Sequence, residues 1–255
     1  MADLVAPLAQ VEIRDRSEGG ASCVADNGTF CFDWAADNFD RYTTPLWEHL
    51  ILVAVPVVLG FLIAFAMAAA SHRRRWLIPP FLGVTGILYT IPSLAFFFLL
   101  LPVTGRGRDT ALIALTAFTL QIIYRNIVAG LNNVPEGAKN AGRGMGMTRN
   151  QLFLRVELPL SVPEIVAGLR IATVSTVAIA TLAVFAGGGG LGASIVGQID
   201  FKTNVIIVAV LCLTMAVILD LLLVLLQGLL SPWRSAGRAD AGRGGFFDTF
   251  RRTAT

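Results

Sequence analysis

The feature that most constrains this chain is an uninterrupted apolar stretch, residues 51–70, in which no side chain is charged. A helix of about twenty apolar residues crosses the roughly 30 Å hydrocarbon core of a bilayer. A helix also satisfies its own backbone hydrogen bonds, as a segment in lipid must. Further long, mainly apolar runs cover residues 76–101, 111–131, 165–186 and 205–230. The sequence therefore predicts an all-α membrane protein with five transmembrane helices.

Composition agrees with a place in the bilayer. Hydrophobic residues make up 55% of the chain and charged residues 15%, whereas about a quarter of the residues of an average soluble domain are charged. A net charge of +3 gives no indication of nucleic-acid binding. Three cysteines without a C-x-x-C spacing and two histidines leave little material for a metal site. We expect neither a metal nor a nucleic-acid partner.

Basic residues predict the orientation, because positively charged loops are enriched on the cytoplasmic side of a membrane. The turn after the first span reads His72-Arg73-Arg74-Arg75. Basic residues of the other proposed cytoplasmic segments are Lys139, Arg143, Arg149, Arg155, Arg234, Arg238, Arg243, Arg251 and Arg252. Those of the proposed external segments are fewer: Arg14, Arg16, Arg41, Arg106, Arg108 and Lys202. We expect the N-terminus outside and the C-terminus in the cytoplasm.

This topology divides the chain into three regions. Residues 1–45 are polar, acidic and without an apolar run of signal-peptide length, and we expect an external tail that is not a cleaved leader. Residues 46–230 form the membrane domain. Residues 231–255 are rich in arginine and are expected to be a cytoplasmic tail.

The external region contains one pattern that leaves alternatives open. Cys23 and Cys31 flank a turn signal at Asp26-Asn27-Gly28, so they form either a disulfide, if this side is oxidising, or two free thiols. Phe30, Phe32 and Trp34 alternate with Cys31 and Asp33, a pattern that indicates a short strand, with a partly disordered tail as the alternative.

The polar interval at residues 132–163 has the local signals of two short helices. Pro135 followed by Glu136 suits the first turn of a helix. Thr148 and, three residues later, Gln151 predict a capping box at the start of a second helix, which Pro159 is expected to end. Between the two helices, a flexible turn is expected at Gly142, Gly144 and Gly146. An apolar face of the second helix, which would suit a groove on a partner, contains Leu152, Phe153 and Val156.

This interval resembles the cytoplasmic loop in the membrane subunits of ATP-binding-cassette (ABC) importers. There, Glu-Ala-Ala is followed after three residues by Gly and after nine more by Ile-x-Leu-Pro. Gly146 and, after nine intervening residues, Val156-Glu157-Leu158-Pro159 fit that spacing. Asn140-Ala141-Gly142 stands where the family has Glu-Ala-Ala. The missing acidic residue implies either weakened coupling or a second subunit with a better motif.

A wider set of short runs is similar to the osmoprotectant branch of these importers, which handles glycine betaine, choline and related compounds. The resemblance extends from about Trp47 to Gln227. The runs that carry it are Tyr124-Arg125-Asn126, Ala129-Gly130-Leu131, Val134-Pro135 and Gly144-Met145-Gly146-Met147.

The resemblance implies a type I ABC importer permease fold in a bacterial cell (inner) membrane, with the interval 132–163 as a coupling-helix loop that docks into a cytosolic ATPase dimer. It implies transport of a compatible solute such as glycine betaine, choline or a related quaternary amine. The other implied partners are a second permease subunit, of the same or a homologous chain, and an external solute-binding protein. The implied coupling residues are Asn140, Ala141, Gly142, Gly146, Leu152, Val156, Leu158 and Pro159.

The chain itself contains no constellation for catalysis. It has no G-x-x-x-x-G-K-[ST] phosphate loop, no H-E-x-x-H and no G-x-S-x-G. We therefore expect no enzymatic activity and no cofactor in this chain, with ATP and Mg bound by the partner ATPase. A self-contained secondary transporter or channel is the main alternative, although the sequence lacks the internal repeat and carboxylate cluster often found there. An intramembrane enzyme would need a catalytic constellation that the spans do not contain.

Polar residues within the spans are the remaining candidates. Asp220 lies too deep to reach the headgroups easily, and we expect it to pair with a neighbour such as Arg170. The run Tyr89-Thr90-Ile91-Pro92-Ser93 also resembles the osmoprotectant branch and predicts a broken helix. Candidate residues of the translocation path are Tyr89, Pro92, Ser93, Thr173 and Thr176. Hydroxylated residues are equally used in helix packing, which stays the alternative for the two threonines.

Overall fold

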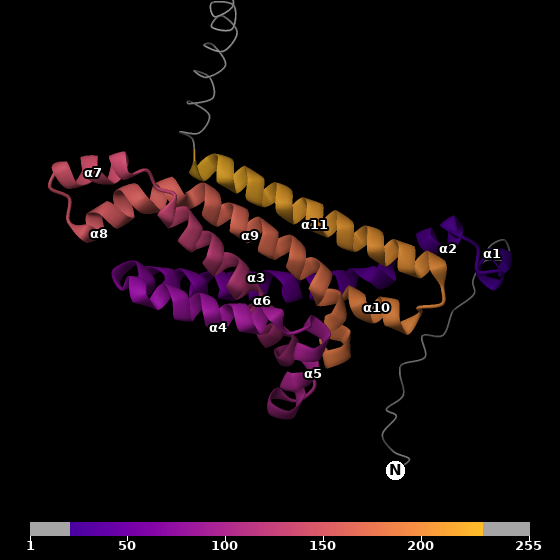
Figure 1. Ribbon diagram of the computed structural model, residues 1–255. Coiled ribbons are helices and arrows are strands. Elements are labelled where there is room, and N and C mark those ends of the chain that lie inside the picture. The colour runs from indigo at the N-terminus through magenta and orange to yellow at the C-terminus, as the bar shows by residue number, and fades with distance from the viewer. Residues whose placement is uncertain (1–20, 232–255) are drawn as a thin grey trace, which may run out of the picture.

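Every regular element of the described chain is a helix. The computed structural model describes residues 21–231 (Figure 1). Four stretches are long and apolar enough to cross a membrane, and they contain α3 (Thr43–Arg73), α6 (Arg108–Asn132), α9 (Leu158–Ala180) and α11 (Lys202–Leu230). A bent pair, α4 (Ile78–Thr90) and α5 (Ser93–Thr104), is together long and apolar enough for a broken span or a re-entrant loop. The predicted all-α membrane fold is thus confirmed, with five spans when the bent pair counts as one.

The two helices of the bent pair meet at 99°. Ile91, the residue before Pro92, takes an extended conformation with ψ 127°, as steric contact with a following proline ring favours. Pro92 then precedes the first turn of α5, and its carbonyl accepts the N–H of Phe96 at 2.9 Å. The broken helix predicted from Ile91-Pro92-Ser93 is therefore present.

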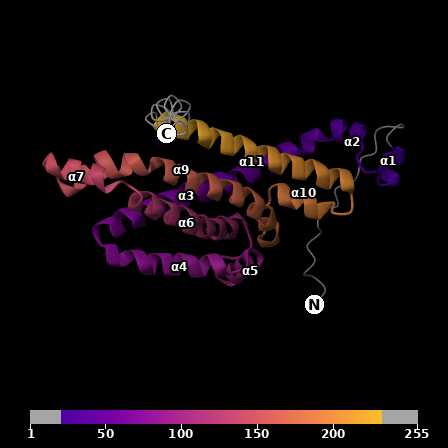
Figure 2. The ribbon, with the colours of Figure 1, turned by 45° about the horizontal axis from the view of Figure 1, so that its top comes forward.

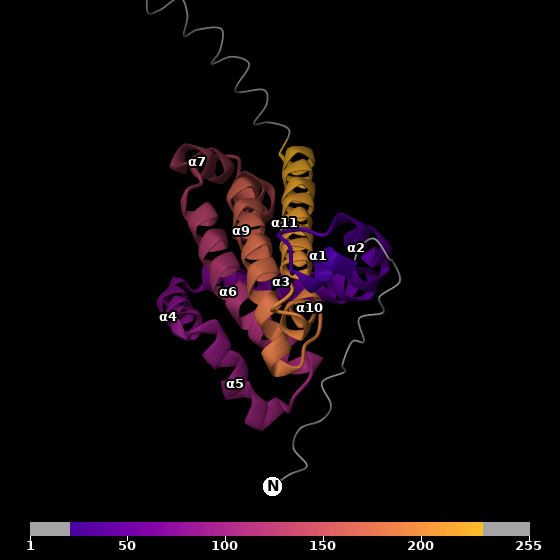
Figure 3. The ribbon, with the colours of Figure 1, turned by 90° about the vertical axis from the view of Figure 1, so that its right-hand side faces the viewer.

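Helix α6 lies at the centre of the bundle. It packs along α3 and α9, while α4 packs on α6 and α11 packs on α9 (Figure 3). Small residues permit these close approaches. A Cβ atom on Gly60 of α3 would lie 2.1 Å from Thr119 Oγ1 of α6, and one on Gly168 of α9 would lie 2.4 Å from Asn126 Cβ of α6.

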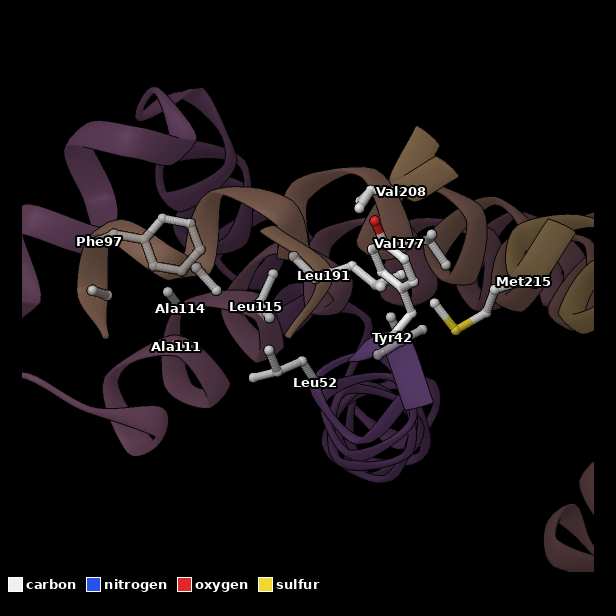
Figure 4. Packing of buried hydrophobic residues seen from close by; sticks show 14 of the residues in the cluster. Tyr42, Leu52, Phe97, Ala111, Ala114, Leu115, Val177, Leu191, Val208 and Met215 are labelled. Atoms are coloured by element: carbon white, nitrogen blue, oxygen red, sulfur yellow. The ribbon is translucent and has the colours of Figure 1, made fainter. Parts of the chain in front are cut away.

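The interior is apolar and joins helices that are distant in sequence. One buried cluster brings together Leu52 of α3, Leu115 of α6 and Val208 of α11 (Figure 4). A second cluster lies around Ile123 and Tyr124 of α6. Helix α11 has the smallest buried share of the four spanning stretches. Its outer face is left for lipid or for another subunit, and contains Leu213, Leu221, Leu225 and Leu229.

The bundle has two different ends (Figures 1 and 2). At one end are α7 (Glu136–Gly144) and α8 (Arg149–Leu152), together with the C-terminal end of α11. The 3-10 turn η2 (Arg75–Leu77) connects α3 to α4. At the opposite end are α1 (Ala21–Ala25), α2 (Phe32–Asp37) and α10 (Leu191–Gly197).

Residues 21–42 form a helical cap on that opposite end, which we call the N-terminal cap. The short strand predicted from Phe30, Phe32 and Trp34 is wrong, because this segment forms α2 and the 3-10 helix η1 (Phe39–Tyr42). Trp34 is buried in edge-to-face contact with Phe201. The alternation of residues near Trp34 in the sequence does not show this contact with a distant residue. A disulfide joins Cys23 to Cys31. Residues 1–20, part of the predicted external tail, and residues 232–255, nearly all of the predicted cytoplasmic tail, lie outside the described residues.

A run of glycines reverses the chain between the 3-10 helix η4 (Thr181–Ala186) and α10. Gly187, Gly189 and Gly190 have φ angles of +83°, +75° and +73°, which are strained for other residues. Gly192 has no room for a side chain, since a Cβ atom there would lie 1.9 Å from the carbonyl oxygen of Thr181. These glycines allow the tight turn between η4 and α10.

Candidate functional site

Helices α7 and α8 form a compact hairpin, residues 135–157, at one end of the bundle (Figure 1). Pro135 precedes the first residue of α7, and Glu136 lies in the first turn, as the sequence predicted. Lys139 is buried and its Nζ lies 3.0 Å from Glu136 Oε1. The hydrogen bond from Lys139 lowers the pKa of the exposed Glu136 carboxyl below its usual value.

The turn between the two helices uses one glycine for its backbone conformation. Gly146 has φ +75°, and its N–H donates to the carbonyl of Arg143 at 3.0 Å. The predicted capping box follows and is confirmed: the Thr148 N–H donates to Gln151 Oε1 at 2.9 Å, and the Gln151 N–H donates to Thr148 Oγ1 at 3.4 Å. Two backbone donors at the start of α8 are satisfied in this way.

A different glycine brings the two helices together. A Cβ atom on Gly142 would lie 2.6 Å from Leu152 Cδ1 and 3.6 Å from Val156 Cγ2. Leu152 is only 6% exposed. The apolar face predicted to fill a partner's groove is therefore partly wrong, because Leu152 and Val156 pack inside the hairpin against Gly142. The spacing of apolar residues along a helix indicates that one face is buried, but it does not show which partner covers that face.

The eight sequence-predicted coupling residues thus divide into two groups. Asn140, Ala141 and Gly146 are exposed on the hairpin. Gly142 and Leu152 are buried in it, while Val156, Leu158 and Pro159 are half-buried at its connection to α9. Only the first group presents a surface to another protein, and Met145, at the tip, adds a large exposed apolar side chain.

Pro159 does not end a helix, contrary to the prediction. Helix α8 continues through η3, a π-helical segment (Phe153–Glu157), into α9, where Pro159 occupies the first turn. In a regular α-helix, a proline ring clashes with the carbonyl of the residue four positions earlier, and the proline has no N–H to donate. The wider π turn before Pro159 moves that carbonyl away from the ring and does not require a hydrogen bond from Pro159. The hairpin is in consequence continuous with a spanning helix, within the helical stretch Arg149–Ala186.

Side chains of the hairpin also hold the end of α3. Arg149 Nη2 donates to the carbonyls of His72 and Arg73 at 2.7 and 3.1 Å, where α3 has carbonyls without helical partners. The His72 ring lies 4.5 Å from the Phe153 ring, centroid to centroid. His72 Nε2 lies 3.2 Å from Glu157 Oε2, whose carboxylate is buried. We call these five residues the α3–α8 junction. Sequence analysis missed it, because the partners are far apart in the chain and only the basic turn at residues 72–75 gave a signal.

Arg170 of α9 and Asp220 of α11 form the ion pair expected from the sequence. Arg170 Nε and Nη2 donate to the two oxygens of Asp220 at 2.7 and 2.8 Å, which is the bidentate geometry of a strong guanidinium–carboxylate pair. The two side chains are 35% and 28% exposed on this chain. The pair fixes the position of α11 along α9.

The candidate path residues lie in two unlike places. Tyr89 is exposed beside the bend, where its ring is T-shaped to that of Phe118, and Pro92 and Ser93 lie at the bend itself. Thr173 and Thr176 are buried, and each hydroxyl donates to the carbonyl four residues earlier, that of Leu169 and Ala172 respectively. This position favours helix packing, the alternative left open for the two threonines.

Three polar contacts were not predicted from the sequence. At the cap end, Glu48 Oε2 accepts the N–H of Gly190 at 3.0 Å, and the buried His49 ring contacts the carbonyl of Val177 at 3.1 Å. Inside the bundle, Thr85 of α4 donates to Gln121 of α6. For Glu48 and His49, the only signal in the sequence was their position just before the apolar run 51–70. Within residues 21–231, no three His, Cys, Asp or Glu residues are grouped so as to hold a metal ion.

Comparison with known proteins gives matches along most of the chain. The family model described as "binding-protein-dependent transport system inner membrane component" matches residues 57–235. The osmoprotectant import permease protein OsmW of Salmonella typhimurium is 35% identical over 204 residues, which cover 77% of this chain and 94% of that protein. The choline transport system permease protein OpuBB of Bacillus subtilis is 34% identical over 188 residues, covering 73% and 87%.

Solved structures match at the level of the fold. An inward-facing form of the MetNI methionine ABC transporter aligns with a TM-score of 0.64 and 21% identity, covering 72% of this chain and 94% of the matched chain. An amino acid ABC transporter crystallised with histidines aligns with a TM-score of 0.58 and 20% identity, covering 83% and 99%.

Proposed function

Since this chain belongs to the family of binding-protein-dependent transport system inner membrane components, we propose that it moves an osmoprotective quaternary amine, such as glycine betaine, choline or carnitine. The chain is the permease subunit of an ABC importer, and its family consists of transport subunits, not catalytic enzymes. The choice of solute class is supported by relatives at 34–35% identity whose names specify osmoprotectant and choline transport. The alternative of a self-contained secondary transporter is not supported by the family match.

One observation carries the mechanism that we propose, namely the continuity of the hairpin with α9 and its attachment to α3. In this mechanism the exposed residues Asn140, Ala141 and Gly146 contact a cytosolic ATPase. Movement of the hairpin on ATP binding would then be transmitted to two spanning helices at once. Because the chain lacks a phosphate loop, ATP and Mg would be bound by that separate ATPase.

The complete transporter would contain a second permease subunit and an external solute-binding protein. A large apolar face of α11 is uncovered in the single chain, as expected if a second subunit or lipid covers it. The hairpin end would face the cytoplasm and the N-terminal cap would lie outside, in agreement with the basic turn at residues 72–75. Solute selection would rest mainly with the binding protein, where aromatic rings can hold a quaternary ammonium.

Co-purification with the cognate ATPase tests the docking proposal. We expect Ala141→Arg, on the exposed face of α7, to abolish co-purification of the ATPase from mild detergent. Ala36→Arg is the matched control, because Ala36 is equally exposed but lies at the opposite end of the bundle. Retention of the ATPase by Ala141→Arg would place the docking surface elsewhere.

Uptake into proteoliposomes tests the solute class. Vesicles that contain the permease, the ATPase and the binding protein are expected to accumulate radiolabelled glycine betaine or choline only with internal ATP. Histidine and methionine serve as controls for other solute classes. Accumulation of an amino acid in place of the quaternary amines would reject the proposed solute, and accumulation without ATPase would reject the proposed mechanism.

A further inference from the structure

A groove of about 490 Å³ is lined by residues of the end of α3, of α8 and of η3, beside the contacts of the α3–α8 junction. Its apolar lining includes Phe65 and Ala69 of α3 and Phe153 and Leu154 of η3. Its polar lining residues are His72, Arg73, Arg149 and Asn150. The groove therefore combines an apolar surface with the cations of Arg73 and Arg149.

The location of the groove matches the boundary between hydrocarbon and headgroups. Helix α3 changes there from the apolar run 51–70 to the basic turn 72–75. Leu62 and Ile63, about two turns before that boundary, are exposed large hydrophobic residues on the same helix. The apolar surface thus extends along α3 toward the groove, and the change from apolar to basic sequence is what we expect where a span reaches the lipid phosphates.

The two arginines have donors left for an anion. Arg73 makes one long hydrogen bond, from Nη2 to Asn150 Oδ1 at 3.4 Å. Arg149 uses Nη2 for the carbonyls of His72 and Arg73, which leaves Nε and Nη1. Both side chains are exposed, and neither forms an ion pair with a carboxylate among residues 21–231. Exposed guanidinium groups with free donors and no carboxylate partner are suited to a phosphate, which they bind through paired N–H donors.

We propose that this groove binds one anionic phospholipid of the inner leaflet. The phosphate would lie between Arg73 and Arg149, and an acyl chain would cover Phe65, Ala69, Phe153 and Leu154. Free phosphate would leave the apolar floor uncovered. A zwitterionic headgroup would bring its ammonium close to the basic turn 72–75, so a net negative headgroup is preferred. The site is independent of the solute and lies on the α3–α8 junction, where it would couple lipid composition to the position of the hairpin.

Native mass spectrometry of the complete transporter in mild detergent tests this site. Phosphatidylglycerol and phosphatidylcholine are titrated separately, and we expect a preference for phosphatidylglycerol. Arg73→Gln and Arg149→Gln should each weaken phosphatidylglycerol retention by about fivefold, the effect of one cation near an anionic lipid surface. Arg74→Gln is the matched control, because Arg74 is the exposed neighbour of Arg73 in the basic turn but does not line the groove.

A second variant separates lipid binding from damage to the hairpin, since Arg149 also holds the end of α3. Ala70 is small, exposed and lines the groove. Ala70→Trp should fill the apolar channel and lower lipid retention while both arginines remain. Equal retention of the two lipids by the native protein would overturn the proposal. So would a phosphatidylglycerol preference that survives Arg73→Gln and Ala70→Trp, because the lipid would then bind elsewhere or a second subunit would cover the groove.

Discussion

The two ends of the bundle are built by different kinds of interaction. The hairpin at residues 135–157 is shaped by contacts between residues a few positions apart, such as the Glu136–Lys139 pair and the capping box. The N-terminal cap is held by contacts across most of the chain. Asn27 Nδ2 donates to the carbonyl of Asp200 at 2.7 Å, and the Cys31 N–H donates to Thr203 Oγ1 at 2.9 Å.

This difference indicates which end is free to move as a unit. A hairpin with its own internal contacts, attached through α9 and the α3–α8 junction, can change its position without losing its shape. The cap, in contrast, is fixed to the start of α11, where Tyr42 also donates to Asn204 Oδ1 at 2.7 Å. In a transporter driven from the hairpin end, we infer that the cap end is the more rigid reference.

The largest loss of stability is expected at Gly192, near the N-terminal cap, where the backbone packs directly against the backbone of Thr181. Gly192→Ala forces a Cβ atom toward the Thr181 carbonyl and should lower stability by about 3 kcal/mol or more. Gly146→Ala, in the hairpin, meets open space and costs only its positive φ, about 1 kcal/mol. Thermal unfolding of the purified protein, followed by intrinsic fluorescence, should rank the two. A larger loss for Gly146→Ala would contradict the contrast between the ends.

Removal of the disulfide is expected to have the next largest effect and to stay within the cap. Cys23 and Cys31 close a short loop, and such a link stabilises by about 2–3 kcal/mol. In the double variant Cys23→Ser with Cys31→Ser, hydrogen exchange should rise in α1 and α2. Exchange in α7 and α8 serves as the internal reference. Faster exchange in both regions would show that the ends are coupled.

Transport should depend on the hydrogen-bonding shape of residue 220 as well as on its charge, because Asp220 pairs with Arg170 in the middle of the bundle. Asp220→Asn keeps an acceptor for Arg170, whereas Asp220→Leu leaves the guanidinium without one. We expect Asp220→Asn to retain most uptake and Asp220→Leu to lose severalfold more, measured at equal amounts of membrane-inserted protein. Equal losses in the two variants would assign Asp220 a role other than pairing.

Sequence analysis succeeded where structure is determined locally. Apolar run length gave the spans, and Pro135 and the Thr148–Gln151 spacing gave the starts of two helices. It failed where a distant residue decides the outcome. The strand predicted at residues 30–34 is absent, and helix α2 begins at Phe32. Trp34 packs on Phe201 and the Cys31 N–H bonds to Thr203, and neither partner is visible in the local pattern.

The site was predictable to a similar extent. The family-like spacing around Gly146 located the hairpin, and the depth of Asp220 indicated a pair with Arg170. The sequence did not show that Leu152 is used inside the hairpin, because apolar spacing is the same for an internal and an external partner. Pro159 was misjudged since the π segment that accommodates it has no recognised signal in this sequence.

The smallest effect is expected at the capping box of α8, and it tests whether the hairpin is a local unit. Thr148→Ala removes the acceptor for the Gln151 N–H and should cost about 1 kcal/mol. Because the box contacts only its own helix, faster hydrogen exchange should be confined to residues 148–152. Thr148→Ser retains the hydroxyl and is the control. A loss of protection that extended to α3 through Arg149 would show that the α3–α8 junction, and not the hairpin's internal contacts, holds α8 in place.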